Sequence, residues 1–231
     1  YIRLLTRSLK LKQEIFIKLR QDLTSSKRRL VGFSREWKVV SIGEIADPKK
    51  KWSFTGGPFG SNLKQKDYAP DGVRIIQLQN IGEGIFLNKY KIFTSKEKAD
   101  ELISCNIYPG EIILSKMGDP VARACIMPST DDRYLMASDG IRLSPDQTRF
   151  NTYFIFQLIN SAKFRAEAEK KSTGSTRKRI SLFDLKKIKL VVPELDEQNA
   201  IAKVLLTAEE ELKKLRETKQ LLIEQKKYLL N

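Results

Sequence analysis

The sequence predicts an α+β protein in which a globular mixed domain is flanked by long coiled-coil helices. Three observations lead to this prediction. Leucine-rich stripes with a helical period occupy both ends of the 231-residue chain. Short apolar runs separated by Gly, Pro, Asn and Asp occupy its middle. Strands and helices are interspersed there without the regular alternation of a parallel α/β sheet, which favours the α+β class.

The C-terminal stripe predicts the longest helix of the chain. Apolar residues recur at alternating steps of four and three, and no Gly or Pro occurs between Glu194 and Asn231. Seven of the nine positions on the stripe are apolar, the nine being Ile201, Leu205, Ala208, Leu212, Leu215, Lys219, Leu222, Lys226 and Leu229. A helix over residues 201–229 would be about 43 Å long. Its narrow stripe is typical of a coiled-coil seam, and a long helix lying on its own domain is the alternative.

The N-terminal stripe has the same period and predicts a second long helix. Six of its eight positions are apolar, the eight being Leu5, Leu9, Lys12, Phe16, Leu19, Leu23, Ser26 and Leu30. We expect this helix to break near residues 24–26. A stripe two residues wide does not stabilise a lone helix in water. The first helix is therefore expected to pack against the last one, or against helices of another chain.

The middle of the chain predicts strands and three capped helices. The strand-like segments are residues 73–78, 111–114, 121–127 and 140–143. Ser95, Asn151 and Ser181 are expected to be N-caps, because their side-chain oxygens can accept hydrogen bonds from the first turn of a helix. The helix after Asn151 is expected to be a longer one, with an apolar stripe from Phe154 to Ala162.

Net charge is +15, with 43 Lys and Arg against 28 Asp and Glu, and it is unevenly distributed. Residues 1–35 contain 10 basic and 2 acidic side chains, and residues 161–190 contain 10 basic and 3 acidic ones. Two basic segments on a neutral body predict a polyanionic partner, and double-stranded DNA is the one we expect. Solvated charge without a partner is the alternative.

The composition excludes several kinds of catalysis. The chain has no histidine, so Ser-His-Asp and Cys-His catalysis and histidine general-base chemistry are excluded. The tetrapeptide Asn/Asp-Pro-Pro-Tyr/Phe of adenine methyltransferases is absent. Glu169 and Lys171, with Asp139 upstream, resemble a nuclease pattern only loosely, because they fall on a predicted helix end. We expect a non-catalytic protein without a cofactor or metal.

Cysteine use and hydropathy bear on the compartment. Cys105 and Cys125 have no CxxC spacing, which favours buried, reduced thiols over a disulfide or a metal site. No apolar run reaches the roughly 18 to 20 residues that a membrane-spanning helix needs. We therefore expect a cytoplasmic protein without a membrane partner.

Three loops are candidates for contact with DNA. The glycine-rich segment 56–64 lacks the order of a phosphate-binding motif, so it is either an ordinary tight turn or a loop whose amides face a phosphate. Segment 172–181 places four hydroxyl residues and a glycine before three consecutive cations. This composition suits phosphate and guanine contacts, and a merely basic surface loop is the alternative. Lys116 and Arg123 flank the third loop.

Amide side chains complete the candidate set. Gln77, Gln79 and Asn80 suit adenine edges, to which amides pair bidentately, unless they face the core and are structural. The residues predicted to contact DNA are Ser61, Asn62, Lys64, Gln77, Asn80, Lys116, Arg123, Ser175, Thr176, Arg177, Lys178 and Arg179.

Six short stretches, in a fixed order over residues 33–231, carry a family resemblance. They are WKVVSIGEI (37–45), GPFGSNLK (57–64), PGEIILSK (109–116), STGST (172–176), LKKIKLVVP (185–193) and EQNAIA (197–202). Together they resemble the specificity (S) subunit of type I restriction-modification systems, and cover one target-recognition domain with its conserved helices.

The resemblance implies a fold and a function. Such subunits carry two target-recognition domains separated by two conserved helices, which pack as an antiparallel coiled coil. Each domain recognises one half of a split DNA target. The helices act as a spacer and as a docking surface for two methylase (M) subunits, and restriction (R) subunits then join. The S subunit itself is non-catalytic.

The resemblance also implies a domain organisation. Residues 1–32 are expected to form an N-terminal coiled-coil helix and connector, residues 33–194 the target-recognition domain, and residues 195–231 the conserved C-terminal helix. One domain instead of two has two explanations: the second half of a longer subunit, or a natural half-subunit that pairs with itself. Both predict a dimer through the helices. The alternative function is a coiled-coil interaction scaffold whose basic patches are incidental.

Overall fold

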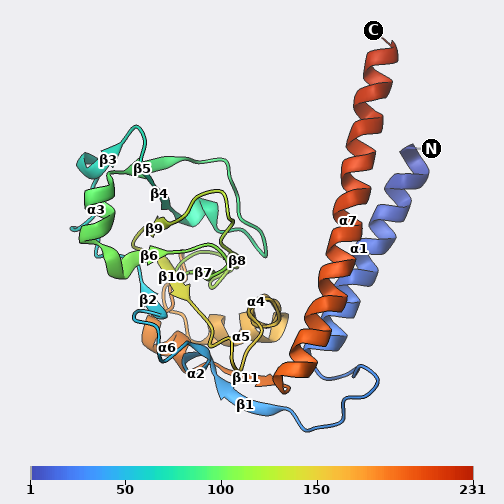
Figure 1. Ribbon diagram of the computed structural model, residues 1–231, viewed down its shortest axis with the longest axis horizontal. Helices are drawn as coiled ribbons and strands as arrows, with labels where there is room; N and C mark the ends of the chain where they lie inside the picture. Colours follow the sequence, from blue (N-terminus) through green and yellow to red (C-terminus); the bar gives the residue numbers. More distant parts are fainter. Residues whose placement is uncertain (1, 231) are drawn as a thin grey trace. The chain divides into compact units, whose positions relative to one another are not determined.

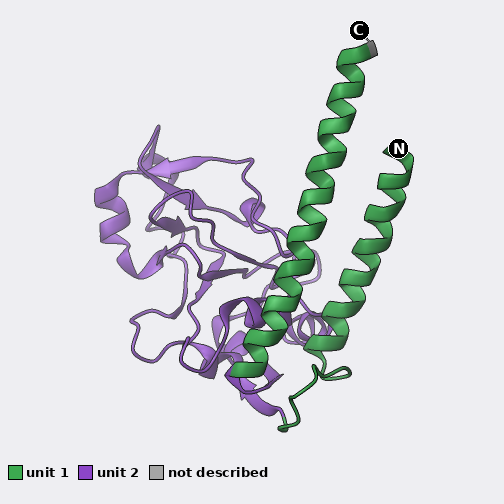
Figure 2. Ribbon diagram, turned by 45° about the vertical axis from the view of Figure 1, so that its right-hand side comes forward, with its two compact units in different colours: residues 1–36, 196–231 green, residues 37–195 purple. Residues whose placement is uncertain are grey.

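The computed structural model describes residues 2–230, with side chains for residues 2–229. The chain forms two compact units (Figure 2). Unit 1 combines residues 1–36 with residues 196–231, and unit 2 comprises residues 37–195.

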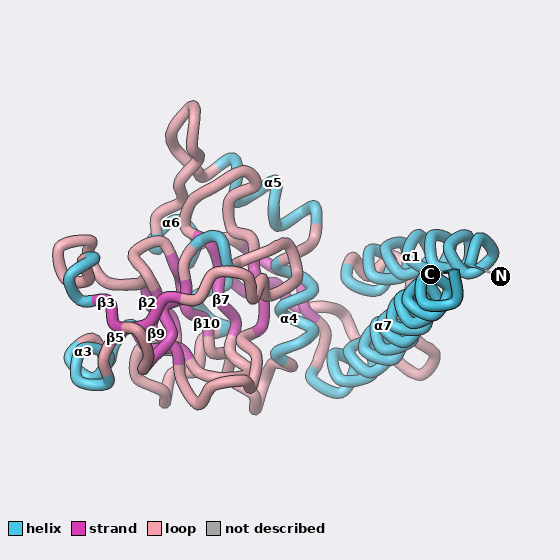
Figure 3. Tube along the Cα trace, turned by 90° about the horizontal axis from the view of Figure 1, so that it is seen from above, coloured by secondary structure: helices cyan, strands magenta, loops and turns pink. Residues whose placement is uncertain are grey.

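Unit 1 is a pair of antiparallel helices, α1 (Ile2–Thr24) and α7 (Leu195–Leu230), of 23 and 36 residues. The two helices lie side by side (Figures 1 and 3). Lys12 forms an ion pair with Glu211, and Arg29 forms one with Glu197 at 2.6 Å. Arg29 follows Lys12 in the chain, whereas its partner Glu197 precedes Glu211. The two segments therefore run in opposite directions.

The predicted stripes are the buried sides of both helices over part of their length. Leu9 and Leu23 are buried on α1, and Leu205 and Leu212 are buried on α7. The stripe becomes exposed toward the C-terminus, where Leu229 is 80% exposed. The expected break of the first helix is confirmed, because α1 ends at Thr24.

Unit 2 contains three sheets within the described residues. The smallest pairs β1 (Lys38–Ser41) with β11 (Lys189–Val192). The second has the order β2 (Phe54–Gly56), β10 (Gly140–Leu143), β7 (Ile112–Ser115) and β8 (Ala124–Ile126). The third has the order β3 (Tyr68–Ala69), β5 (Ile92–Thr94), β4 (Val73–Ile76), β9 (Tyr134–Met136) and β6 (Asn106–Ile107). The β4–β9 pair is parallel, and the other pairs in these sheets are antiparallel.

Short helices cover and connect the sheets (Figure 1). They are α2 (Ile42–Ile45), α3 (Lys96–Glu101), α4 (Thr152–Ile159), α5 (Ala162–Lys170) and α6 (Leu182–Lys186), with 3-10 turns η1 (Gln65–Asp67), η2 (Leu78–Asn80) and η3 (Ile103–Cys105). The expected caps are confirmed: the side chains of Ser95, Asn151 and Ser181 each accept a hydrogen bond from a backbone N–H in the first turn of the following helix. The predicted mixed α and β class is confirmed as well.

The prediction of a single longer helix after Asn151 is wrong. Two helices replace it, because α4 ends at Ile159 and α5 begins at Ala162. Ser161 caps α5 by accepting a hydrogen bond from Phe164 N at 3.3 Å. A polar cap therefore interrupts an apolar stripe that looks continuous in the sequence.

The core of unit 2 lies around the central strands. Every residue of β7 and β10 is buried, including Arg142, whose guanidinium pairs with Glu111 at 2.7 Å. Cys105 and Cys125 are free and buried, as predicted, and burial raises the pKa of the Cys125 thiol to about 12. Among the helices of residues 2–230, none has the length and apolar character to cross a bilayer.

Candidate nucleic-acid interface

Several loops of unit 2 leave the two larger sheets at the same end. Strand β10 runs antiparallel to β2 and β7, so β2 and β7 end where β10 begins. Strands β4 and β9 run parallel and stop together, since Ile76 pairs with Met136. We call this region the loop end and define it as residues 57–64, 77–80, 116–123, 137–139 and 172–180.

Backbone hydrogen bonds connect these loops. Gly57 N donates to Gly140 O at 2.8 Å, and Ala137 N donates to Ile76 O at 2.9 Å. Lys116 N donates to Asp139 O at 2.7 Å. Segments that are far apart in sequence are therefore held within hydrogen-bonding distance of residues 137–140.

Residues 172–180, which we call the basic loop, are closed by their own backbone. Thr173 and Arg179 exchange two hydrogen bonds of 2.8 Å, which brings the hydroxyl residues and the cations onto one tight loop. Gly118 N donates to Lys178 O, and Ile180 N donates to Lys116 O, both at 3.0 Å. The cations of the second basic segment are thereby attached to the hairpin loop between β7 and β8.

The glycine-rich loop needs a glycine at position 57, because its backbone lies against that of Ala137. A Cβ at this position would lie 1.9 Å from the carbonyl oxygen of Ala137. The next residue, Pro58, is buried, whereas Phe59 is 83% exposed. The loop therefore has a rigid base and a projecting aromatic ring.

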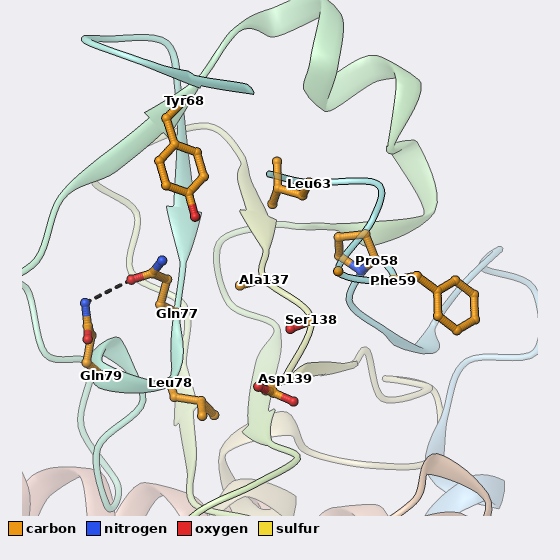
Figure 4. Close-up of a pocket in the computed structure, with 11 residues that line it drawn as sticks. Pro58, Phe59, Leu63, Tyr68, Gln77, Leu78, Gln79, Ala137, Ser138 and Asp139 are labelled. Atoms are coloured by element: carbon orange, nitrogen blue, oxygen red, sulfur yellow. Dashed lines mark hydrogen bonds between the residues drawn. The ribbon is translucent and has the colours of Figure 1, made fainter. Parts of the chain in front are cut away.

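A cleft of about 270 Å³ opens between the loops. Tyr68 and Gln77 lie on one side of it, and Pro58 and Leu63 lie on the other (Figure 4). Gln79 Nε2 donates to Gln77 Oε1 at 2.9 Å, as the dashed line in Figure 4 marks. This arrangement exposes polar amide atoms beside an apolar wall.

Most predicted contact residues are accessible at the loop end. The exposed ones are Ser61, Asn62, Lys64, Ser175, Thr176, Arg177 and Arg179. The half-buried ones are Gln77, Lys116, Arg123 and Lys178. Gln79, also considered for adenine, is exposed. The Arg123 side chain packs over Gly118, with its terminal nitrogen 3.3 Å from where a Cβ would stand.

Asn80 is a correction to the predicted set. Its side chain is 1% exposed, and its amide nitrogen donates to Leu87 O and Tyr90 O, each at 3.0 Å. Its Oδ1 accepts from Gln77 N at 3.0 Å. Asn80 therefore fastens the turn after β4 and has no polar atom left for a base.

Carboxylates pair with two cations of the basic loop. Arg179 Nη2 lies 2.9 Å from Asp139 Oδ1, and Lys178 Nζ forms an ion pair with Glu169 on α5. In the sequence, these two acids stand out only as parts of a loose nuclease pattern. Their role depends on the fold, because Asp139 and Arg179 are 40 positions apart. No group of three metal-ligating side chains comes together in the described part of the chain.

Phe59 and Tyr68 line the cleft, although neither belongs to the predicted set of DNA-contacting residues. Phe59 lies inside the glycine-rich segment, and an apolar residue between two turn-forming glycines was the available signal. Tyr68 gave no such signal, because nothing local distinguishes it from a core tyrosine. Phe59 lies at the loop end and Tyr68 lines the adjoining cleft, and an exposed ring can stack on a base.

Comparison with known proteins identifies the family of the chain. The model of the type I restriction modification DNA specificity domain matches residues 34–225. The chain therefore belongs to this family, and is a specificity-subunit domain of a type I restriction-modification system.

Particular relatives are remote in sequence. The specificity subunit of the type I restriction enzyme MjaVIII of Methanocaldococcus jannaschii is 22% identical over 224 residues. That alignment covers 95% of this chain and 50% of the relative, so the chain spans about half the length of the curated relative that it matches.

Solved structures share the fold. The S subunit from M. genitalium has a TM-score of 0.63 at 16% identity, over 99% of this chain and 55% of that one. The HsdS subunit from Thermoanaerobacter tengcongensis has a TM-score of 0.58 at 16% identity, over 94% and 49% of the two chains.

Proposed function

We propose that unit 2 recognises one half of a bipartite DNA target in a sequence-specific manner and that the chain performs no catalysis itself. The supporting observation is the common location of the donor-bearing loops. Hydroxyls, amides and cations from separate stretches of sequence share the loop end, and phosphate and base-edge recognition need this mixture.

The side chains divide into two kinds of contact. Ser61, Asn62 and Lys64 suit phosphate oxygens, since hydroxyl, amide and ammonium groups all donate. Gln77 and Gln79 suit an adenine edge, and Arg177 suits either a phosphate or guanine. The apolar wall of the cleft suits a thymine methyl group.

Unit 1 supplies the spacing in this proposal. The 36 residues of α7 correspond to about 54 Å of rigid helix, longer than the roughly 34 Å that separates half-sites one DNA turn apart. Exposed apolar residues, among them Leu4, Leu11 and Leu221, leave surface for further helices. We assign that surface to the second half of the assembly, from another copy or another domain, and to M subunits, after which R subunits join.

Selection of DNA by the purified chain tests the proposal. Duplexes bound from a randomised pool should become enriched in one short motif. Arg177→Ala should relax preference at one position of that motif by about 1–3 kcal/mol if Arg177 contacts a base. Lys51→Ala is the control, because Lys51 is an exposed cation that precedes β2, at the opposite end of its sheet.

The scaffold alternative predicts a different result. If the basic patches are incidental, the pool emerges without an enriched motif, whereas the helices still bind their protein partners. Mapping methylated sites in cells that express the chain with its methylase is the second measurement. A methylated half-site, or its palindrome at fixed spacing, supports the proposal and distinguishes pairing with a different half from pairing with itself.

A further inference from the structure

The basic loop holds two of its cations in internal ion pairs. Lys178 pairs with Glu169, and Arg179 pairs with Asp139. Among the described residues, Arg177 has no carboxylate partner of this kind, although it belongs to the same run. Neighbouring cations on one loop therefore differ in whether they are available to an incoming anion.

The two carboxylates are positioned by structure that does not depend on their charge. Asp139 lies between Ser138 and the start of β10, and its backbone oxygen accepts from Lys116 N. Glu169 is on α5, whose N-terminus is capped by Ser161. The backbone around both carboxylates is therefore fixed by bonds other than their ion pairs with the basic loop.

Their exposure allows exchange. The Arg179 side chain is 47% exposed and the Lys178 side chain is 36% exposed. A phosphate can therefore reach either cation, but it must displace a carboxylate to do so. Exposed ion pairs are weak, so this competition lowers affinity for DNA without abolishing it.

We propose that Asp139 and Glu169 are specificity-determining residues that lower the affinity of the basic loop for DNA of arbitrary sequence. This inference rests on the proposed function. Random DNA offers Lys178 and Arg179 little besides phosphates, which compete with the carboxylates. A target sequence that also contacts Gln77, Gln79 and Arg177 offsets that competition. Suppressing unwanted partners by repulsive groups is an established route to selectivity.

Asp139 also repels phosphate directly. Asp139 lines the cleft together with Gln77 and Gln79, so a backbone phosphate entering the cleft meets a negative charge. A base edge carries no such charge, and a cytosine amino group can donate to a carboxylate. The cleft therefore favours bases over phosphates.

Neutral isosteres test the inference. Asp139→Asn and Glu169→Gln, made in the full chain, should each bind a short labelled duplex of random sequence about two- to fivefold more tightly at low salt. The gain should shrink as salt is raised, because screening weakens exposed charges. Fluorescence anisotropy across a salt series measures both effects.

Matched controls separate this effect from a change in net charge. Asp100→Asn and Glu101→Gln add the same charge, and their partners Arg133 and Lys98 lie outside the loop end. Removing the paired cation in the same chain, as in Glu169→Gln with Lys178→Gln, should abolish the gain. The double-mutant cycle then assigns the effect to the pair.

The outcomes distinguish the inference from the proposed function. If the wild-type chain binds no duplex even at low salt, the proposed function fails. If it binds, and both isosteres behave like the controls, only the inference is overturned. A folded Asp139→Asn variant that binds more weakly also overturns it, since the carboxylate would then orient Arg179 for DNA.

Discussion

Gly57 shows how a single residue can determine the shape of the loop end. Its Cα faces the Ala137 carbonyl so closely that a methyl group would lie 1.9 Å from the oxygen. The obstacle is backbone, which cannot rotate away. The conformation of residues 57–64 therefore depends on the missing side chain.

Gly57→Ala is expected to lower the free energy of unfolding by about 1–3 kcal/mol, because a strand end must shift to admit the methyl group. Gly60→Ala is the control, since nothing lies within 4 Å of a Cβ there. Its expected change is within about 0.5 kcal/mol. Urea unfolding midpoints measure both, and equal midpoints would contradict the steric argument.

The neighbouring amides show what a sequence cannot resolve at this scale. Gln77, Gln79 and Asn80 are chemically alike, and each suits an adenine edge. The 3-10 turn η2 directs Asn80 inward to bond Leu87 and Tyr90 backbone, and leaves Gln79 exposed. The direction of each side chain depends on the turn type, which composition alone does not specify.

Among the elements, α7 forms two ion pairs with the N-terminal segment, one with Lys12 of α1 and one with Arg29, which follows α1. The Glu197 side chain is 3% exposed and is held by Arg29, whereas Glu211 is 60% exposed and is held by Lys12. A buried carboxylate that loses its partner retains its desolvation cost, whereas an exposed one is solvated by water.

Arg29→Met is therefore expected to destabilise the protein by about 2–4 kcal/mol. Lys12→Met removes the exposed pair and should cost less than about 1 kcal/mol. Thermal or urea unfolding followed by circular dichroism provides the comparison. Equal losses for the two variants would mean that Glu197 is solvated in solution.

The elements also divide into predictable and unpredictable ones. The stripes and the caps at Ser95, Asn151 and Ser181 are local signals, and the structure confirms them. The boundary between α4 and α5 was missed, because the stripe from Phe154 to Ala162 continues across it. Ser161 reads equally well as a residue on a polar helix face and as a cap.

The whole molecule carries a net charge of +15, and the loop end holds six of its cations: Lys64, Lys116, Arg123, Arg177, Lys178 and Arg179. If each meets one phosphate, the logarithm of the DNA binding constant should fall with the logarithm of salt concentration with a slope of about −5. Binding titrations at several salt concentrations measure the slope. Lys64→Gln should reduce its magnitude by about 1, and an unchanged slope would remove Lys64 from the interface.

The candidate site was predictable in its parts but not in its assembly. Segments 56–64, 116–123 and 172–181 stood out by composition. Their convergence follows from the strand order, and above all from the parallel pairing of β4 with β9, which no local pattern encodes. The partners Asp139 and Glu169 could not be assigned for the same reason.

The pairing of β2 with β10 places Phe54 opposite Leu143. More than half of unit 2 lies between these two strands in the sequence. During synthesis on the ribosome, the first strand must wait for the second before their ladder can close. The basic loop follows still later. A nascent chain interrupted before residue 180 therefore lacks the bonds that close the basic loop and attach it to Lys116, and its loop end is incomplete.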